Sequence, residues 1–98
     1  MLVKLSYYPA VKREVDDACC WYDERKEGLG NEFFQEFERA LAKIAANPQA
    51  FPLAPFGRRK APLKRFPYVI SYRVLLDRIR ILSVHHDKRH PSYGEGRR

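Results

Sequence analysis

The sequence is poor in cysteine and has no long apolar run. Its two cysteines, Cys19 and Cys20, are adjacent, and neighbouring cysteines rarely bridge each other because the link strains the peptide. Two thiols also make no zinc framework, so we expect both to be reduced and structural. No apolar stretch approaches the roughly 20 residues that a membrane helix requires, and the N-terminus lacks a signal-peptide pattern. These features argue against a disulfide-rich secreted protein and a membrane protein, and they favour a cytoplasmic one.

Ninety-eight residues suit one compact domain, 1–98, with a single hydrophobic core. The net charge of +7 is unevenly distributed along this chain. Residues 1–50 hold seven Lys and Arg against nine Asp and Glu, whereas residues 51–98 hold twelve against three, so the halves carry −2 and +9. So basic a half is typical of a protein that binds a polyanion, such as nucleic acid or an acidic protein, although a solvated surface tuned for solubility is the alternative.

The first half of the chain predicts a strand followed by two helices. Residues 2–7 alternate in polarity as a half-buried strand does, and Pro9 suits the first turn of a helix that runs to about Lys26. After the glycines of the segment EGLGN, Asn31 is the expected N-cap of a second helix, which ends at Asn47 before a proline. The apolar faces consist of Val11, Val15, Ala18 and Tyr22 in the first helix and Phe34, Phe37, Leu41 and Ile44 in the second.

The second half predicts a proline-rich connection at 48–57 and then three strands. Pro62 indicates that residues 58–65 form an edge strand, because proline cannot donate a ladder hydrogen bond. Residues 68–75 and 78–86 are rich in β-branched and aromatic side chains and form a tight hairpin. The expected register pairs Tyr72 with Ile81, Val74 with Ile79, Tyr68 with His85 and Arg73 with Arg80. Facing arginines destabilise a sheet, so we expect an anion or a partner on that face.

The predicted fold is therefore α+β, with the order β-α-α-β-β-β and an antiparallel sheet that carries the α-helical hairpin on one face. Basic side chains should lie on the edge strand, the other sheet face and the tail, and residues 91–98 should form a loose basic tail. The candidates for binding a target or a partner protein are Arg58, Arg59, Lys60, Lys64, Arg65, Arg73, Arg80, Lys88 and Arg89.

The segment SVHHDKRHPSY, residues 83–93, contains every histidine of the chain. His86 and His90 have the spacing of a metal pair on a helix. Here, however, they follow a predicted strand and precede Pro91, and the cations around them repel a divalent ion. The sequence therefore predicts no metal site, and no motif for a cofactor accompanies it.

The same segment also suits general acid–base chemistry. Histidine titrates near neutrality, arginine can clamp a phosphate, and tyrosine can relay a proton. Such groups could cleave RNA without a metal by using the 2′-OH as an internal nucleophile. The candidates are Arg89, His86, His85, Arg65 and Tyr93. In the alternative interpretation, one histidine is an ordinary sheet residue, and the arginines pair with Asp87 or contact a partner.

A set of short segments, in this order, resembles the RelE/ParE superfamily, the toxins of type II toxin–antitoxin systems. The matching residues are Trp21 and Tyr22, the glycine-broken hairpin, Asn47 and Pro48, the segment RFPY at 65–68, Tyr72, and finally His86, Arg89 and Pro91. The resemblance covers about residues 2–93 and implies the same β-α-α-β-β-β fold. It also implies a growth-inhibiting toxin of the plasmid-stabilisation type. A small acidic antitoxin would silence the toxin. The toxin would contact operator DNA only indirectly, through this antitoxin.

The superfamily divides by target, and the resemblance points to both branches. RelE-like members cleave mRNA in the ribosomal A site, whereas ParE-like members bind DNA gyrase and are not enzymes. The ribonuclease branch typically carries an arginine three residues before the tyrosine that matches Tyr72, and this chain has Val69 there. Because a phosphate clamp contributes several kcal/mol to catalysis, we expect the gyrase-binding function, with the endoribonuclease as the alternative. An inactive member and a plain basic nucleic-acid-binding module are further alternatives.

Overall fold

The computed structural model describes residues 4–98, which form five strands, two α-helices and one 3-10 helix. The elements are β1 (Leu5–Tyr7), α1 (Ala10–Arg25), α2 (Leu29–Ala46), β2 (Leu53–Ala54), η1 (Pro55–Gly57), β3 (Arg58–Pro62), β4 (Tyr68–Val74) and β5 (Ile79–His86). The predicted α+β fold is confirmed, and the two-residue β2 is an addition to it. The first residues of the strand predicted at 2–7 lie outside the described part of the chain.

The five strands form one sheet in the order β1-β5-β4-β3-β2. β1 pairs with β5 in parallel, with Leu5 opposite Ile79, whereas the other neighbours are antiparallel. The sheet is therefore mixed and not wholly antiparallel as predicted. Both helices and three strands separate β1 from β5, and so long a connection allows parallel pairing. β3 is also not an edge strand, because β2 pairs with Arg58 and Arg59.

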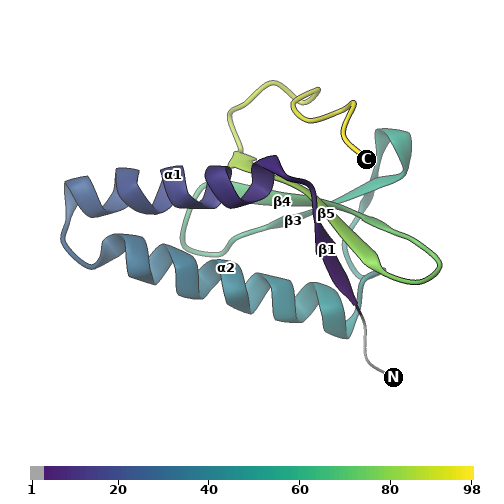
Figure 1. Cartoon of the computed structure of the whole chain (residues 1–98), viewed down its shortest axis with the longest axis horizontal. Helices are drawn as coiled ribbons and strands as arrows, with labels where there is room; N and C mark the ends of the chain where they lie inside the picture. The colour runs from purple at the N-terminus through teal and green to yellow at the C-terminus, as the bar shows by residue number, and fades with distance from the viewer. Residues whose placement is uncertain (1–3) are drawn as a thin grey trace.

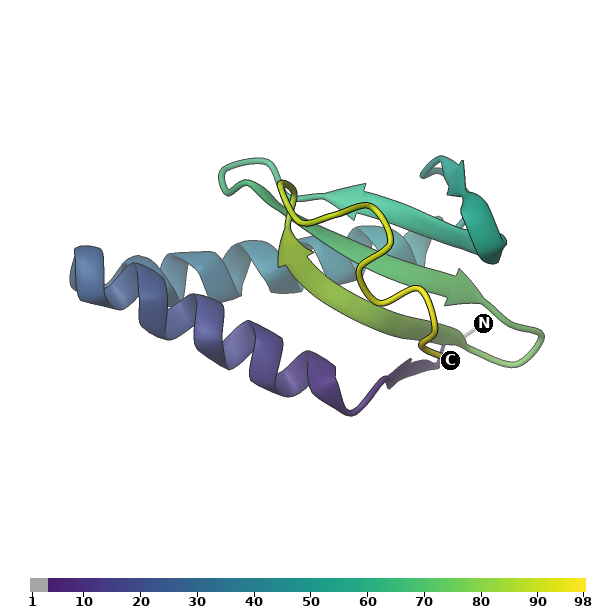
Figure 2. The same ribbon diagram turned by 90° about the horizontal axis from the view of Figure 1, so that it is seen from above.

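The helices and the C-terminal segment lie on opposite faces of this sheet. Figure 1 shows α1 and α2 as an antiparallel pair, in which α1 contacts β5 and α2 contacts β3. Figure 2 shows the segment after β5 running back over the sheet along that strand. A Cβ atom added to Gly94 in this segment would lie 3.4 Å from the Cβ of Ser83 in β5, so the two are in contact. Both faces of β5 are thus covered.

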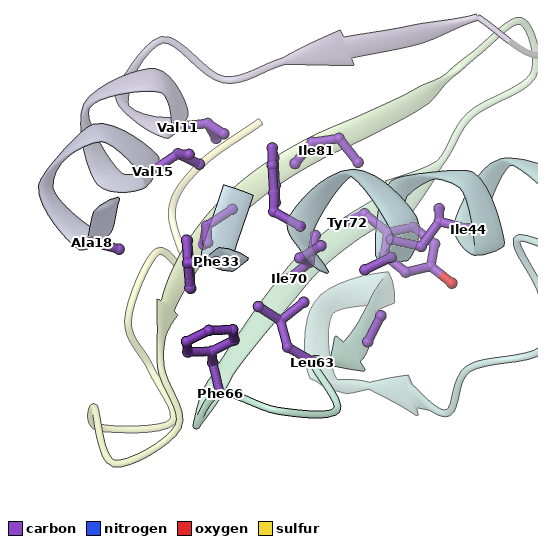
Figure 3. Close-up of a cluster of buried hydrophobic side chains, with 14 of the residues drawn as sticks. Val11, Val15, Ala18, Phe33, Ile44, Leu63, Phe66, Ile70, Tyr72 and Ile81 are labelled. Carbon is purple, nitrogen blue, oxygen red and sulfur yellow. The ribbon is translucent and has the colours of Figure 1, made fainter. Parts of the chain in front are cut away.

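The core lies between the helices and the sheet and is centred on aromatic rings. Side chains from both helices, from the 63–66 segment and from the central strands meet in one cluster (Figure 3). Phe33 of α2 is fully buried, and its ring centroid lies 5.2 Å from that of Phe66 and 5.0 Å from that of Tyr68. Tyr22 of α1 stacks on Phe33 at 5.5 Å. Edge-to-face and stacked aromatic pairs stabilise beyond their buried area, so the RFPY segment locks the sheet onto the hairpin.

The register of β4 and β5 follows the prediction only up to a bulge. Three predicted pairs are present, including Arg73 opposite Arg80, but the register shifts between Ser71 and Tyr72 and leaves Leu82 unpaired in this ladder. Tyr68 consequently faces His86 and not His85, so that prediction is wrong. A bulge inserts one extra residue and re-aims the side chains beyond it.

A tight approach between the two helices determines where α2 begins. Its N-cap is Gly28, which has a φ of 87°, and the helix starts two residues before the predicted cap at Asn31. Asp23 of α1 supplies the missing cap, since its Oδ1 accepts a hydrogen bond from the N–H of Gly30 at 2.8 Å. Gly30 is buried, and a Cβ atom there would lie 2.4 Å from the backbone oxygen of Cys19. The second glycine of EGLGN therefore serves helix packing.

We expect Gly30→Ala to lower the free energy of unfolding by about 1–3 kcal/mol, because the added methyl group must push the helices apart. This loss would occur although alanine is the better helix former. Urea unfolding followed by circular dichroism measures it. Gly96→Ala is the matched control, since a Cβ atom at Gly96 would meet no heavy atom within 4 Å. Equal stability of the two variants would contradict the close-approach explanation.

Candidate functional site

Four of the five predicted catalytic residues surround one small hollow between α1 and the end of β5. The hollow has a volume of about 230 Å³ and is lined by Glu14, Asp17, Ala18, Trp21, Tyr68, Val84, His85, His86, Arg89 and Tyr93. Arg65, the fifth candidate, does not line it. Its guanidinium is bound 2.7 Å from the carboxylate of Glu32 in α2. The structure thus gathers the histidines with Arg89 and Tyr93 and leaves Arg65 elsewhere.

Glu14 is the side chain on which the geometry of this hollow depends. Its Oε1 accepts a hydrogen bond from the backbone N–H of Val84 at 3.0 Å. Its Oε2 accepts hydrogen bonds from the hydroxyl of Tyr93 and from Arg97 Nη1, the latter at 2.8 Å. Arg97 also donates to the carbonyl of Leu82 at 3.1 Å. Glu14 and Arg97 therefore attach the C-terminal segment to α1 and to the edge of β5 at once.

His85 is buried beneath this C-terminal segment. Only 6% of the residue is exposed, its Nδ1 lies 3.0 Å from the hydroxyl of Ser83, and its ring centroid lies 5.0 Å from that of Tyr93. Burial, reinforced by the positive charge of Lys60, lowers the pKa of His85 to about 4. The imidazole is therefore neutral at pH 7, and little of its surface is open to a substrate.

Tyr93 is also poorly placed for proton transfer. Burial and the hydrogen bond to Glu14 raise the pKa of its hydroxyl, so the phenol keeps its proton and directs it at a carboxylate. Arg89 lies with its guanidinium carbon 4.9 Å from the centre of the Tyr93 ring, a cation–π contact. The accessible chemical groups are thus Arg89 and His86, whose Nδ1 accepts a hydrogen bond from the N–H of Lys88 at 3.1 Å.

Four arginines of the predicted basic surface bind backbone carbonyls of the chain itself. Each holds a loop or the C-terminal segment against the sheet, as the donor–acceptor distances show. Arg58 donates to Tyr93 at 3.3 Å, Arg59 to Phe51 at 2.7 Å, Arg73 to Phe56 at 2.7 Å and Arg80 to Arg98 at 3.3 Å. Lys60 is half-buried, while Lys64, Arg65, Lys88 and Arg89 are exposed. The basic residues therefore do not form one continuous binding face.

Two expectations change as a result. Arg58 was predicted to contact a partner, but only 2% of it is exposed, because residues 55–57 and the C-terminal segment cover it. Residues 91–98 were expected to be a loose tail. They instead form turns closed by hydrogen bonds such as the 3.0 Å bond from the N–H of Arg97 to the carbonyl of Gly94. The charge that suggested a loose tail is what anchors it, through Arg97 and Glu14.

Glu14 and Arg97 were not among the site residues predicted from the sequence. A signal for Glu14 was present, since it lies three residues after Val11 and four before Ala18, within the buried face of α1. A carboxylate at such a position is seldom buried without a partner. Nothing in the sequence indicated that its partners would be Tyr93 and Arg97, which lie 79 and 83 residues further along the chain.

A second, larger hollow lies between the two helices and was not predicted. It has a volume of about 640 Å³ and is lined mostly by apolar side chains of β1, α1 and α2, namely Tyr7, Tyr8, Pro9, Val11, Val15, Phe34, Phe37 and Leu41, with Lys12, Asp16 and Glu38 at its margin. Tyr7 and Phe34 are 45% and 41% exposed. Phe34 was predicted to lie in the core. It instead lies at the margin of the apolar face of α2, where it lines this hollow.

No family model matches this sequence, and no curated protein matches it either. Among solved structures, the chain is similar to one from the structure titled "Chromosomal ParDE TA system from P. aeruginosa". The TM-score is 0.77 at 19% sequence identity, and the match covers 87% of this chain and 96% of the other. This likeness agrees with the predicted β-α-α-β-β-β fold.

Two further properties concern only the part of the chain that the structure describes. No helix within residues 4–98 is both long and apolar enough to cross a membrane. In the same part of the chain, His, Cys, Asp and Glu side chains form no group of three that could hold a metal ion.

We expect the stability of the protein to fall as the pH drops from about 6.5 to 4, in part because of His85. Its pKa is lower in the folded chain than in the unfolded chain, so the unfolded chain binds a proton first, and stability is present above this window and lost within it. The loss should be about 2–3 kcal/mol for this group. Urea unfolding at several pH values measures it.

Because other groups also titrate in this window, the comparison is with His85→Asn, which keeps a hydrogen-bonding group near Ser83 but does not ionise. The variant should show a shallower pH dependence than the wild type. The exposed His90→Asn serves as the control and should keep the wild-type slope. Parallel curves for the wild type and His85→Asn would contradict a buried neutral imidazole.

Proposed function

We propose that the protein is the toxin of a type II toxin–antitoxin system and that it inhibits growth by binding DNA gyrase. The toxin assignment is supported by the likeness to a chain of a ParDE system over nearly the whole of both chains. The single observation that favours binding over RNA cleavage is the hollow that holds the predicted catalytic groups. Its walls carry the carboxylates of Glu14 and Asp17, and its most buried histidine, His85, is neutral.

Cleavage of RNA requires positive charge where the scissile phosphate lies. The ribonuclease branch has an arginine three residues before the tyrosine that matches Tyr72. In this chain that position holds Val69, which the bulge in β5 places directly opposite His85. A neutral, apolar side chain therefore adjoins the histidine where a phosphate clamp would be most effective. Arg97 does not replace it, because Glu14 already binds its guanidinium.

The ribonuclease remains the alternative function, and one arrangement supports it. Half-buried His86 and exposed Arg89 line the same hollow, so a general base and one phosphate-binding group are present within a single short segment. A ribosome could supply the remaining groups or shift the C-terminal segment.

Two assays on the purified chain separate these functions. If it binds gyrase, it should inhibit DNA supercoiling by gyrase and leave mRNA on translating ribosomes intact. His86→Ala should then inhibit supercoiling as the wild type does, since it removes an imidazole that binding does not require. Codon-positioned cuts in mRNA that disappear in both His86→Ala and Arg89→Ala would instead establish the ribonuclease. Absence of both effects, together with normal growth on expression, would reject the toxin function.

We further propose that an antitoxin silences the protein by placing an amphipathic helix in the apolar groove between α1 and α2. The groove suits this mode of binding, because apolar side chains form its walls while Lys12, Asp16 and Glu38 at its margin can orient a partner. The basic residues first expected to bind the antitoxin are less suited to this role, since several already hold the fold together.

We expect Phe34→Glu to weaken the complex with the antitoxin by at least about tenfold, because it places a charge in the middle of an apolar contact. The partner for this test is the short acidic protein that we expect from an adjacent reading frame, and isothermal titration calorimetry measures its affinity. Leu76→Glu is the control, since Leu76 is fully exposed at the tip of the β4–β5 hairpin. If both variants bind as tightly as the wild type, the antitoxin does not occupy the groove.

A further inference from the structure

A hollow lined by arginines lies between the β4–β5 hairpin and the end of the C-terminal segment. It has a volume of about 330 Å³, and its walls are Arg73, Leu75, Arg78, Arg80 and Arg98. None of these residues lines the hollow around His86. Figure 2 shows the C-terminal end of the chain lying over the start of β5, where Arg80 donates a hydrogen bond to the backbone oxygen of Arg98 at 3.3 Å.

The positive charge of this arginine hollow is only partly compensated. Arg73 and Arg80 face each other across the two strands, and within residues 4–98 neither forms an ion pair with an Asp or Glu side chain. Arg73 binds the neutral carbonyl of Phe56, and Arg80 binds the backbone oxygen of Arg98, the last residue of the sequence. In the described part of the chain Arg73 Nε is buried and has no hydrogen-bond partner. Asp77 pairs with Arg78 at 3.0 Å and is exposed.

The fold maintains this like-charge pair at a cost in stability. Arginines directly opposite each other on a sheet repel, and a buried donor without a partner is unfavourable as well. Both costs fall when an anion binds between the two guanidinium groups. The sequence predicted a basic sheet face that binds an anion or a partner. The structure places the facing arginines of that prediction at this end of the hairpin.

We propose that the arginine hollow binds phosphate groups of a nucleic-acid backbone. Guanidinium groups form paired hydrogen bonds with phosphate oxygens. A second hollow of about 470 Å³, which Glu95 and Arg97 also line, shares Arg73 and Arg98 with the first, so these two arginines can contact successive phosphates of one strand. This binding goes beyond the proposed function, because it requires neither gyrase nor antitoxin.

An acidic peptide fits the same hollow less well. Peptides bind by adding to a free sheet edge or by filling apolar pockets, whereas β4 has neighbours on both sides and Leu75 is the single apolar side chain in the lining. The nearby carbonyls of Phe56 and Arg98 already accept hydrogen bonds from arginines. A phosphodiester strand needs donors and positive charge alone, and the hollow supplies these.

Fluorescence anisotropy of the full chain with a labelled duplex DNA, and with a duplex RNA of the same sequence, tests the proposal. We expect binding that weakens with salt, as phosphate contacts do. Arg80→Gln should reduce the affinity about tenfold and lower the salt slope by about one unit. Arg78→Gln should act in the same direction and leaves the hydrogen bonds of the C-terminal segment intact, so a loss there is not a folding defect.

Arg13→Gln is the matched control, since it removes the same charge from α1, where the Arg13 side chain is 88% exposed. It should bind as the wild type does. The relative affinity for DNA and RNA identifies the natural source of the phosphates, and either preference supports the site. Failure to bind both duplexes, equal losses in Arg80→Gln and Arg13→Gln, or equally tight binding of polyglutamate would overturn the proposal.

Discussion

The ion pair between Glu14 and Arg97 completes the edge of β5, and the rest of the functional end of the molecule depends on it. β1 pairs with β5 only from Ile79 to Ile81, because α1 begins soon after β1 and carries the chain away from the sheet. Beyond that point the edge of β5 has unpaired backbone groups, and such groups are costly when buried. Arg97 binds the carbonyl of Leu82 and Glu14 binds the N–H of Val84. Two charged side chains thus form hydrogen bonds to β5 that a neighbouring strand would otherwise form.

This arrangement explains how so basic a half-chain folds against itself. Burying charge is unfavourable unless it is paired and hydrogen-bonded, and Glu14 and Arg97 meet that condition with side chains only 12% and 16% exposed. Three arginines of the sheet, Arg58, Arg59 and Arg73, bind backbone carbonyls, which accept hydrogen bonds without neutralising charge. The fold is therefore held by guanidinium groups that keep their positive field. A second buried glutamate, Glu36 of α2, attaches the loop between β3 and β4 through the N–H of Lys64.

Periodicity in the sequence was sufficient to predict the helices, the hairpin register near its turn and the order of the elements. These are local properties, set by apolar spacing and by glycine and proline. The bulge at Leu82 was not predictable, because β5 is buried on both faces from Ile81 to His85, so its apolar residues do not mark which side faces the core. The candidate site was only partly predictable for a different reason. His86 and Arg89 are three residues apart in the sequence. The burial of His85, however, depends on Tyr93, which is held by Glu14, 79 residues away from it. A contact of that range leaves no periodic trace in the sequence.

The distribution of free charge bears directly on the function. An enzyme that cleaves RNA gains most when its cations lie where negative charge develops on the scissile phosphate, within reach of its acid–base groups. In this chain His85 and His86 adjoin Glu14, Asp17 and Val69, while a group of four arginines gathers at the opposite end of the same strands, namely Arg73, Arg78, Arg80 and Arg98. Apart from Arg89, which lines the hollow with His86, the arginines that can bind an anion are thus separated from the acid–base groups by the length of the hairpin. That separation suits a protein that holds a charged partner at one end and makes specific contacts at the other, and it suits a phosphoryl-transfer site poorly.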